Sequence, residues 1–168
     1  VLKQACAEVV KWPEDMRIAV NLSPAQFKSR TLALDVAAAI AASGLSPRRV
    51  ELEITETVML QDTDVTLATL NQLRDIGVRI SMDDFGTGYS SLSYLRRFPF
   101  DKIKIDQSFV RDLEVKGDAI AIVRAVTSLG VSLGMSTTAE GVETPEQLEM
   151  LRSEGCSEVQ GFLFSKAI

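Results

Sequence analysis

Apolar residues recur along the chain in two patterns, one with helical spacing and one that alternates as in a strand. The alternating pattern predicts strands at 17–22, 50–55, 78–84, 102–106, 135–140 and 159–162. Helical spacing precedes each strand, at 1–11, 32–45, 64–77, 90–98, 117–130 and 145–155. Regular alternation of helix and strand predicts a parallel α/β architecture, and the absence of a linker-like segment favours one domain.

The predicted strands are apolar on one face only. In 50–55, Val50, Leu52 and Ile54 alternate with two glutamates and a threonine. Central strands of an open doubly wound sheet are covered by helices on both faces and should be apolar on both. One polar face favours a TIM (βα)8 barrel, in which the outer helices bury the apolar face of each strand. The interior at the C-terminal mouth of such a barrel can be polar and carry functional residues. Such a barrel needs eight strands and about 250 residues. We therefore expect residues 1–168 to form an incomplete barrel of about six βα units without its N-terminal strands.

Charge and composition exclude several classes of function. The chain has 18 basic and 23 acidic residues, a net charge of -5, and no basic run that would follow a DNA backbone. It has no histidine, and its two cysteines lie far apart, which excludes Ser-His-Asp catalysis, thiol–imidazole catalysis and the usual zinc sites. No apolar run reaches the roughly 18 residues of a membrane span. We expect a cytoplasmic domain without membrane contact, any anchor of a parent protein lying outside the chain.

Polar residues stand at or just past the C-terminal end of every predicted strand. Any one of them alone is more often a helix cap or a solvated loop residue. Six consecutive strands with this feature favour a shared site, and oxygen ligands without His or Cys suit Mg²⁺ or Mn²⁺, with room for two ions. The residues are Asn21, Glu53, Glu56, Asp83, Asp84, Lys104, Asp106, Glu140, Glu143 and Gln160.

A glycine loop, FGTG at 85–88, follows the adjacent aspartates. It matches neither the phosphate-binding G-x-x-x-x-G-K-[ST] motif nor the dinucleotide fingerprint, which needs a third glycine. We interpret it as a flexible turn beside a cation site, since two neighbouring carboxylates require a positive partner.

Six segments in this order and spacing resemble the EAL-domain family of cyclic di-GMP phosphodiesterases: NLSPAQF, ELEITET, DDFGTGYSSL, FDKIKID, TAEGVET and QGFLFS. The resemblance implies a modified TIM barrel that hydrolyses one phosphodiester bond of cyclic di-GMP to linear pGpG with Mg²⁺ or Mn²⁺. No Glu-Ala-Leu-type motif, whose glutamate ligates metal in the family, precedes NLSPAQF. That departure agrees with the expected lack of N-terminal strands and leaves open whether the chain is active by itself.

The resemblance also implies a role for each matching position. Lys104 matches a lysine near the attacking water, and Glu140 a general base or metal-site residue. Glu56 matches the anchor of the glycine loop, Glu143 a supporting acid, and Gln160 a residue that positions water and ligand. The metal ligands implied are Asn21, Glu53, Asp83, Asp84 and Asp106.

Three functions remain open at this point. The first is a phosphodiesterase with intact catalytic positions, and the second is an inactive relative that senses cyclic di-GMP. The third is another metal-dependent barrel enzyme with a lysine base, of the enolase type. The resemblance further implies a homodimer formed near the glycine loop, where Tyr89, Leu92 and Tyr94 are candidates for contact, and an upstream sensor or GGDEF-type domain in the parent chain.

Overall fold

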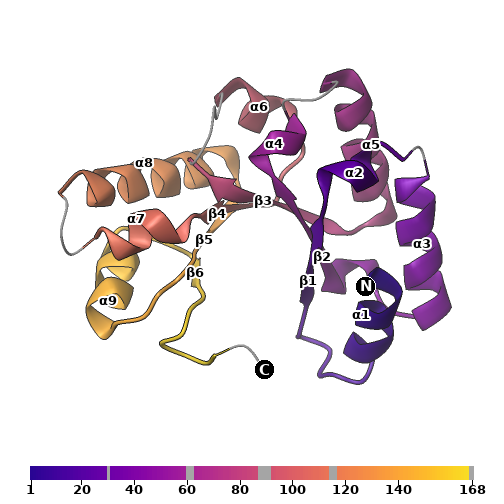
Figure 1. The fold of residues 1–168 in the computed structure, drawn as a ribbon, viewed down its shortest axis with the longest axis horizontal. Coiled ribbons are helices and arrows are strands. Elements are labelled where there is room, and N and C mark those ends of the chain that lie inside the picture. Colours follow the sequence, from indigo (N-terminus) through magenta and orange to yellow (C-terminus); the bar gives the residue numbers. More distant parts are fainter. Residues whose placement is uncertain (30, 60–62, 87–91, 114–116, 167–168) are drawn as a thin grey trace. The chain divides into compact units, whose positions relative to one another are not determined.

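The computed structural model describes residues 1–29, 31–59, 63–86, 92–113 and 117–166 (Figure 1). The chain forms two compact units, Val1–Ser81 with Ser91–Phe100 (unit 1) and Met82–Ser90 with Asp101–Ile168 (unit 2). The second half of the glycine loop (residues 87 and 88) and Tyr89 lie outside the described residues.

Unit 1 is built on two parallel strands, β1 (Ile18–Leu22) and β2 (Val50–Thr55), with Asn21 opposite Glu53 in register. The first residues of β3 (Arg79–Phe85) also belong to this unit. Helix α1 packs against α3, and α3 packs against α5. The helices and the 3-10 turn are α1 (Leu2–Val9), α2 (Pro24–Phe27), α3 (Leu32–Ser43), η1 (Pro47–Arg49), α4 (Glu56–Met59), α5 (Thr63–Ile76) and α6 (Leu92–Arg97).

Unit 2 contains the end of β3 and the parallel strands β4 (Lys102–Ile105), β5 (Ser136–Ala139) and β6 (Glu158–Val159). Its helices are α7 (Gln107–Arg111), α8 (Gly117–Leu133) and α9 (Pro145–Ser153). Helix α8 packs against β4 and β5. The buried side chains of Ile103, Ile105 and Val123 form part of this core. Thr144 caps α9 by accepting a hydrogen bond from the backbone N–H of Gln147.

The hydrogen-bonded strand order is β1-β2-β3-β4-β5-β6, the same as the order along the chain. This confirms the predicted sheet of six strands that alternate with helices. The predicted apolar face is buried, since Leu52, Ile54 and Ile103 are fully buried. The polar face is buried as well in the middle of the sheet, because Glu51 and Lys104 are each only 4% exposed.

The predicted extent of the last strand is wrong. It was expected at 159–162, whereas β6 is Glu158–Val159. The backbone leaves the sheet after Gln160, whose carbonyl accepts from the N–H of Val142, and a turn then brings the N–H of Phe164 to the carbonyl of Gly161. Short helices α2, α4 and α7 were not predicted, because four or five residues are too few to show a helical period.

Among the described residues, no helix is both long enough and apolar enough to cross a membrane.

Candidate active site

Three predicted residues of unit 2 bring their carboxylates together. One oxygen each from Asp83, Asp84 and Glu140 lies within 4.8 Å of the other two. Asp83 and Asp84 lie near the C-terminal end of β3, just before Phe85, and Glu140 directly follows β5. Oxygen ligands stand about 2.0–2.6 Å from Mg²⁺ or Ca²⁺, so oxygens at this separation can share one hard divalent cation. The donor set therefore fits a metal ion of that kind.

The backbone at Asp84 is left-handed, with φ of 55°, the one described non-glycine residue with positive φ. A regular strand would direct the side chains of Asp83 and Asp84 to opposite faces. Their carboxylates lie together instead. Aspartate tolerates the left-handed region better than most residues, so the chain adopts this turn without glycine.

Lys104 on β4 places an ammonium group inside this acidic cluster. Its Nζ lies 2.8 Å from Oδ1 of Asp83 and 2.5 Å from Oε1 of Glu140, and the side chain is only 5% exposed. The same Oε1 of Glu140 accepts a hydrogen bond of 2.7 Å from Nε2 of Gln160. Glu140 is thus oriented by two donors, the ammonium of Lys104 on β4 and the amide of Gln160 directly after β6.

Without a bound metal ion, repulsion and burial make the ionised carboxylates of the cluster unfavourable. Burial raises the pKa of Asp84 above its ordinary value, and the charges of Asp83 and Asp106 raise it further. Lys104 lowers that pKa, but it offsets the other effects only in part. A bound divalent cation would favour the ionised carboxylates, which agrees with the fit of the donor set.

Asp106 has a structural role that the sequence left open. Its Oδ1 accepts from the N–H of Ser108 at 3.0 Å and from Oγ of Ser108 at 2.5 Å, and it caps α7. Asp106 does not belong to the three-carboxylate cluster found among the described residues. One of its two carboxylate oxygens is therefore already engaged by the helix that follows.

A cavity of about 430 Å³ adjoins Glu140 within unit 2. Gln107, which the sequence did not single out, belongs to its wall; its position directly after Asp106 was the available signal. A Cβ on Gly141 would lie 2.6 Å from Cβ of Gln107, so glycine permits this close approach. The lining residues are Gln107, Glu140, Gly141, Glu143, Gln160, Gly161, Phe162 and Ser165.

Unit 1 carries the other three predicted site residues at the C-terminal ends of its strands. Asn21 is exposed on β1 and faces Glu53 of β2 in register, whereas Glu53 is buried. Glu56 is also buried and begins α4 immediately after β2.

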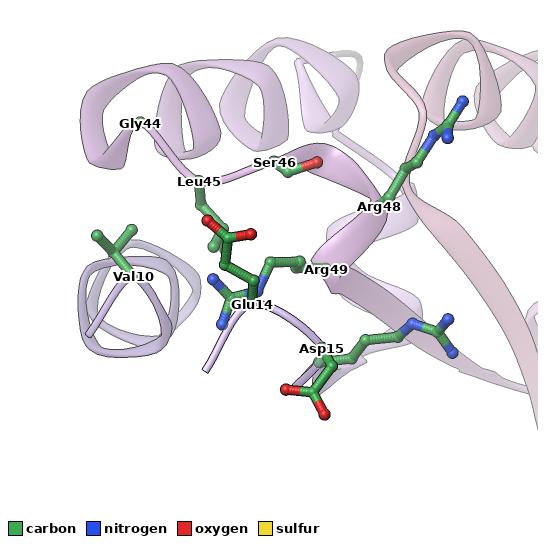
Figure 2. Close-up of a pocket in the computed structure, with 9 residues that line it drawn as sticks. Val10, Glu14, Asp15, Gly44, Leu45, Ser46, Arg48 and Arg49 are labelled. Atoms are coloured by element: carbon green, nitrogen blue, oxygen red, sulfur yellow. The ribbon is translucent and has the colours of Figure 1, made fainter. Parts of the chain in front are cut away.

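A larger cavity, of about 570 Å³, lies at the opposite, N-terminal ends of β1 and β2 in unit 1 (Figure 2). Arg49 there donates to the backbone carbonyls of Val9, Trp12, Pro13 and Met16 at 2.8–3.2 Å. Figure 2 shows Arg48 extending away from Arg49. Because none of the predicted site residues lines this cavity, its size does not make it the active site.

Residues 1–167 match the EAL domain. The chain belongs to the EAL domain family. The resemblance inferred from the sequence motifs is thereby confirmed.

Curated relatives of this EAL chain are much longer than it is. An uncharacterised protein of Sinorhizobium fredii, y4lL, is 54% identical over 164 residues, which are 98% of this chain and 20% of that protein. The bifunctional diguanylate cyclase/cyclic di-GMP phosphodiesterase MucR of Pseudomonas aeruginosa is 44% identical over 170 residues, covering 99% of this chain and 25% of MucR. The chain thus spans a fifth to a quarter of these two relatives.

Solved EAL structures share the fold closely. The cyclic di-GMP complex of the MucR phosphodiesterase superposes with a TM-score of 0.93 at 43% identity, covering 98% of this chain and 68% of that one. Klebsiella pneumoniae BlrP1 with manganese and cyclic di-GMP gives 0.90 at 38% identity, covering 98% of this chain and 42% of that one. A further BlrP1 complex contains calcium.

Proposed function

We propose that this EAL chain contributes the catalytic residues of a phosphodiesterase that hydrolyses one phosphodiester bond of cyclic di-GMP, giving linear pGpG. The observation that carries the proposal is the arrangement of Lys104, which touches both Asp83 and Glu140 beside a cluster able to hold a cation. Membership of the EAL family and the phosphodiesterase activity named for MucR support it.

Glu140 is the residue best arranged to accept a proton from the attacking water. Its carboxylate is fixed by Lys104 and Gln160, and it borders the cavity in which a phosphodiester could lie. A positioned carboxylate of this kind contributes typically about 10²–10⁴-fold to rate. Lys104 places positive charge where negative charge develops on the phosphate oxygens, and Glu143 adds a second acid to the cavity wall.

We further propose that the chain binds two Mg²⁺ or Mn²⁺ ions. The proposed ligands are Asp83 and Asp84 in unit 2, with Asn21 and Glu53 of unit 1 as additional ligands. Asp106 would use the oxygen that does not cap α7, and Glu56 would support the glycine loop. When bound, such ions polarise the phosphate and lower the pKa of coordinated water. The manganese and calcium complexes of BlrP1 support a divalent cation without choosing between the metals.

The decisive experiment incubates the chain, and in parallel the full-length gene product, with cyclic di-GMP and either Mg²⁺ or Mn²⁺. Chromatography then measures pGpG. We expect the full-length protein to form pGpG and EDTA to abolish the reaction. Tight binding of cyclic di-GMP without any pGpG would overturn the enzyme proposal in favour of a receptor.

A matched pair of variants tests the role of Glu140. Glu140→Gln preserves shape but removes the proton acceptor, and we expect a loss of at least about 100-fold in kcat. Glu149→Gln makes the same change on α9 outside the site and should keep wild-type turnover. Full turnover by Glu140→Gln would refute the role assigned to Glu140.

Several features remain predictions. The homodimer, an upstream sensor or GGDEF-type domain and the cytoplasmic location rest on the sequence and the resemblance. MucR, named as bifunctional, gives one example of an EAL relative with a second activity.

A further inference from the structure

A second lysine stands on the polar face of β4, two residues before Lys104. Because side chains alternate along a strand, Lys102 and Lys104 share one face, about 6–7 Å apart along β4. Lys102 is also largely buried, and its Nζ lies 2.6 Å from Oε2 of Glu158 on β6. The same oxygen is 3.2 Å from Oγ1 of Thr138 on β5, which donates to it.

Each lysine therefore binds a glutamate, and each of these two glutamates accepts a second hydrogen bond from a neutral donor. Oε1 of Glu140 accepts from Lys104 and from Gln160. Oε2 of Glu158 accepts from Lys102 and from Thr138. We call the first set the upper ion pair and the Lys102–Glu158 set the lower ion pair.

The strand register places Glu158 in one row with Lys104, two strands away. Thr138 is opposite Lys104 in the pairing of β4 with β5, and it is also opposite Glu158 in the pairing of β5 with β6. Lys102, in contrast, is opposite Ser136. Thr138 stands between them, and a rotation of the Glu158 side chain toward β4 would offer its carboxylate to the Lys104 ammonium as an alternative acceptor.

Charge decides which acceptor Lys104 prefers. With Lys102 at 2.6 Å, the charge of Glu158 is neutralised, and little attraction toward Lys104 remains. Without that neutralisation, Glu158 competes with Glu140 and Asp83 for one ammonium group. Glu158 is 42% exposed as a side chain, so it can rotate toward a new partner.

We propose that Lys102 is a positioning residue: by binding Glu158 it keeps Lys104 on Glu140 and Asp83. Its effect on hydrolysis rests on the proposed phosphodiesterase function, whereas its effect on the position of Lys104 does not. In this proposal Lys102 acts through Glu158, by setting which partner Lys104 binds.

The test removes the charge of Lys102 and then removes the competitor. In the full-length protein, Lys102→Met should lower kcat by about ten- to a hundredfold, because small misplacements of a catalytic group cost that much, with KM nearly unchanged. Lys102→Arg keeps the charge and should retain activity. The double variant Lys102→Met/Glu158→Gln has no competing carboxylate and should recover kcat to within a few-fold of wild type.

Two readouts do not depend on turnover. Crystal structures should show Nζ of Lys104 shifted from Glu140 toward Glu158 in Lys102→Met and returned in the double variant. Titration with Mn²⁺ should show tighter binding in Lys102→Met, because Asp83 and Glu140 lose their competing ammonium. A merely structural defect would weaken Mn²⁺ binding and turnover together, so opposite signs identify the positioning role.

Arg124→Met is the matched control. It removes the cation of an ion pair between α8 and the residue that follows α9, in which Arg124 contacts Glu154 at 2.7 Å, and should leave kcat and Lys104 unchanged. The proposal fails if folded Lys102→Met keeps Lys104 on Glu140, or if the double variant stays as impaired as the single one. If Lys102→Met does not fold, the double variant decides: a folded, active protein supports the proposal, and an unfolded or inactive one overturns it.

A wild-type protein that forms no pGpG would remove the proposed function alone. The position of Lys104 in the variant structures would still decide the role of Lys102.

Discussion

At the scale of single residues, Asp84 links the chemistry of the cluster to protein stability. Burial, and then the charges of Asp83 and Asp106, raise its pKa in the folded chain. The folded state consequently holds this proton more tightly than the unfolded state does. The favourable contribution of protonated Asp84 to the free energy of unfolding is complete below the ordinary aspartate pKa of about 3.9. It is lost as the pH rises through the raised pKa of Asp84 in the folded chain. Near neutral pH, the ionised group therefore destabilises the cation-free protein.

Asp84→Asn should accordingly raise the thermal midpoint of the cation-free protein at pH 7, and the difference from wild type should shrink toward pH 3. The same variant should lose most of the rise in midpoint that Mn²⁺ gives the wild type, because a proposed ligand is gone. Scanning calorimetry with EDTA or Mn²⁺ measures both effects. Asp75→Asn, on the exposed side of α5, is the control; an Asp84→Asn protein less stable than wild type in EDTA would contradict this account.

At the scale of elements, the segment after β6 depends on the absence of a side chain at one position. A Cβ on Gly161 would stand 2.1 Å from the carbonyl oxygen of Val142, and this is backbone that cannot rotate away. Gly161→Ala should therefore lower the free energy of unfolding by about 1–3 kcal/mol or more. It should also reduce kcat, because the displaced backbone carries Gln160 away from Glu140.

Gly155→Ala separates crowding from backbone strain. Gly155 also has positive φ, 78°, but a Cβ there would meet no atom within 4 Å. Its cost should be only about 1–2 kcal/mol, with kcat retained. Urea unfolding of both variants measures the difference, and equal losses would show that crowding at Gly161 is unimportant.

The connection between α1 and β1 is tied to the side chain of Arg49. Arg49 donates to four backbone carbonyls there, at 2.8–3.2 Å. Arg49→Met should destabilise unit 1 by roughly 2–3 kcal/mol, since hydrogen bonds from a charged donor are lost and carbonyls are left without it. Arg48→Met, one residue earlier and exposed, should stay within about 0.5 kcal/mol of wild type by urea unfolding.

The sequence predicted most long elements because their patterns extend over many residues. The strand predicted at 50–55 is β2, and the helix predicted at 64–77 differs from α5 by one residue at each end. The proximity of Asp83, Asp84 and Glu140 was also expected from strand ends. The capping bonds of Asp106 and the contacts of Lys104 with Asp83 and Glu140 could not be predicted, because they depend on side-chain geometry between strands.

At the scale of the whole molecule, the proposed ligand and the protein carry charge of the same sign. The chain has a net charge of -5, and cyclic di-GMP is a dianion. In EDTA, added NaCl should strengthen binding of a fluorescent cyclic di-GMP analogue by screening repulsion. With saturating Mn²⁺ the site becomes less negative, and added NaCl should instead weaken binding. The same salt dependence in both conditions would argue against cations as the bridge between protein and dinucleotide.

The bonds of Arg49 also set an order of events during synthesis. They join residues 33 to 40 positions apart, so the acceptor carbonyls of Val9 and Met16 leave the ribosome well before Arg49 does. At about 5–20 residues per second, the carbonyls after α1 wait roughly 2–8 s for the guanidinium that binds them. During that interval the nascent segment lacks this clamp, and α1 is accessible to a chaperone.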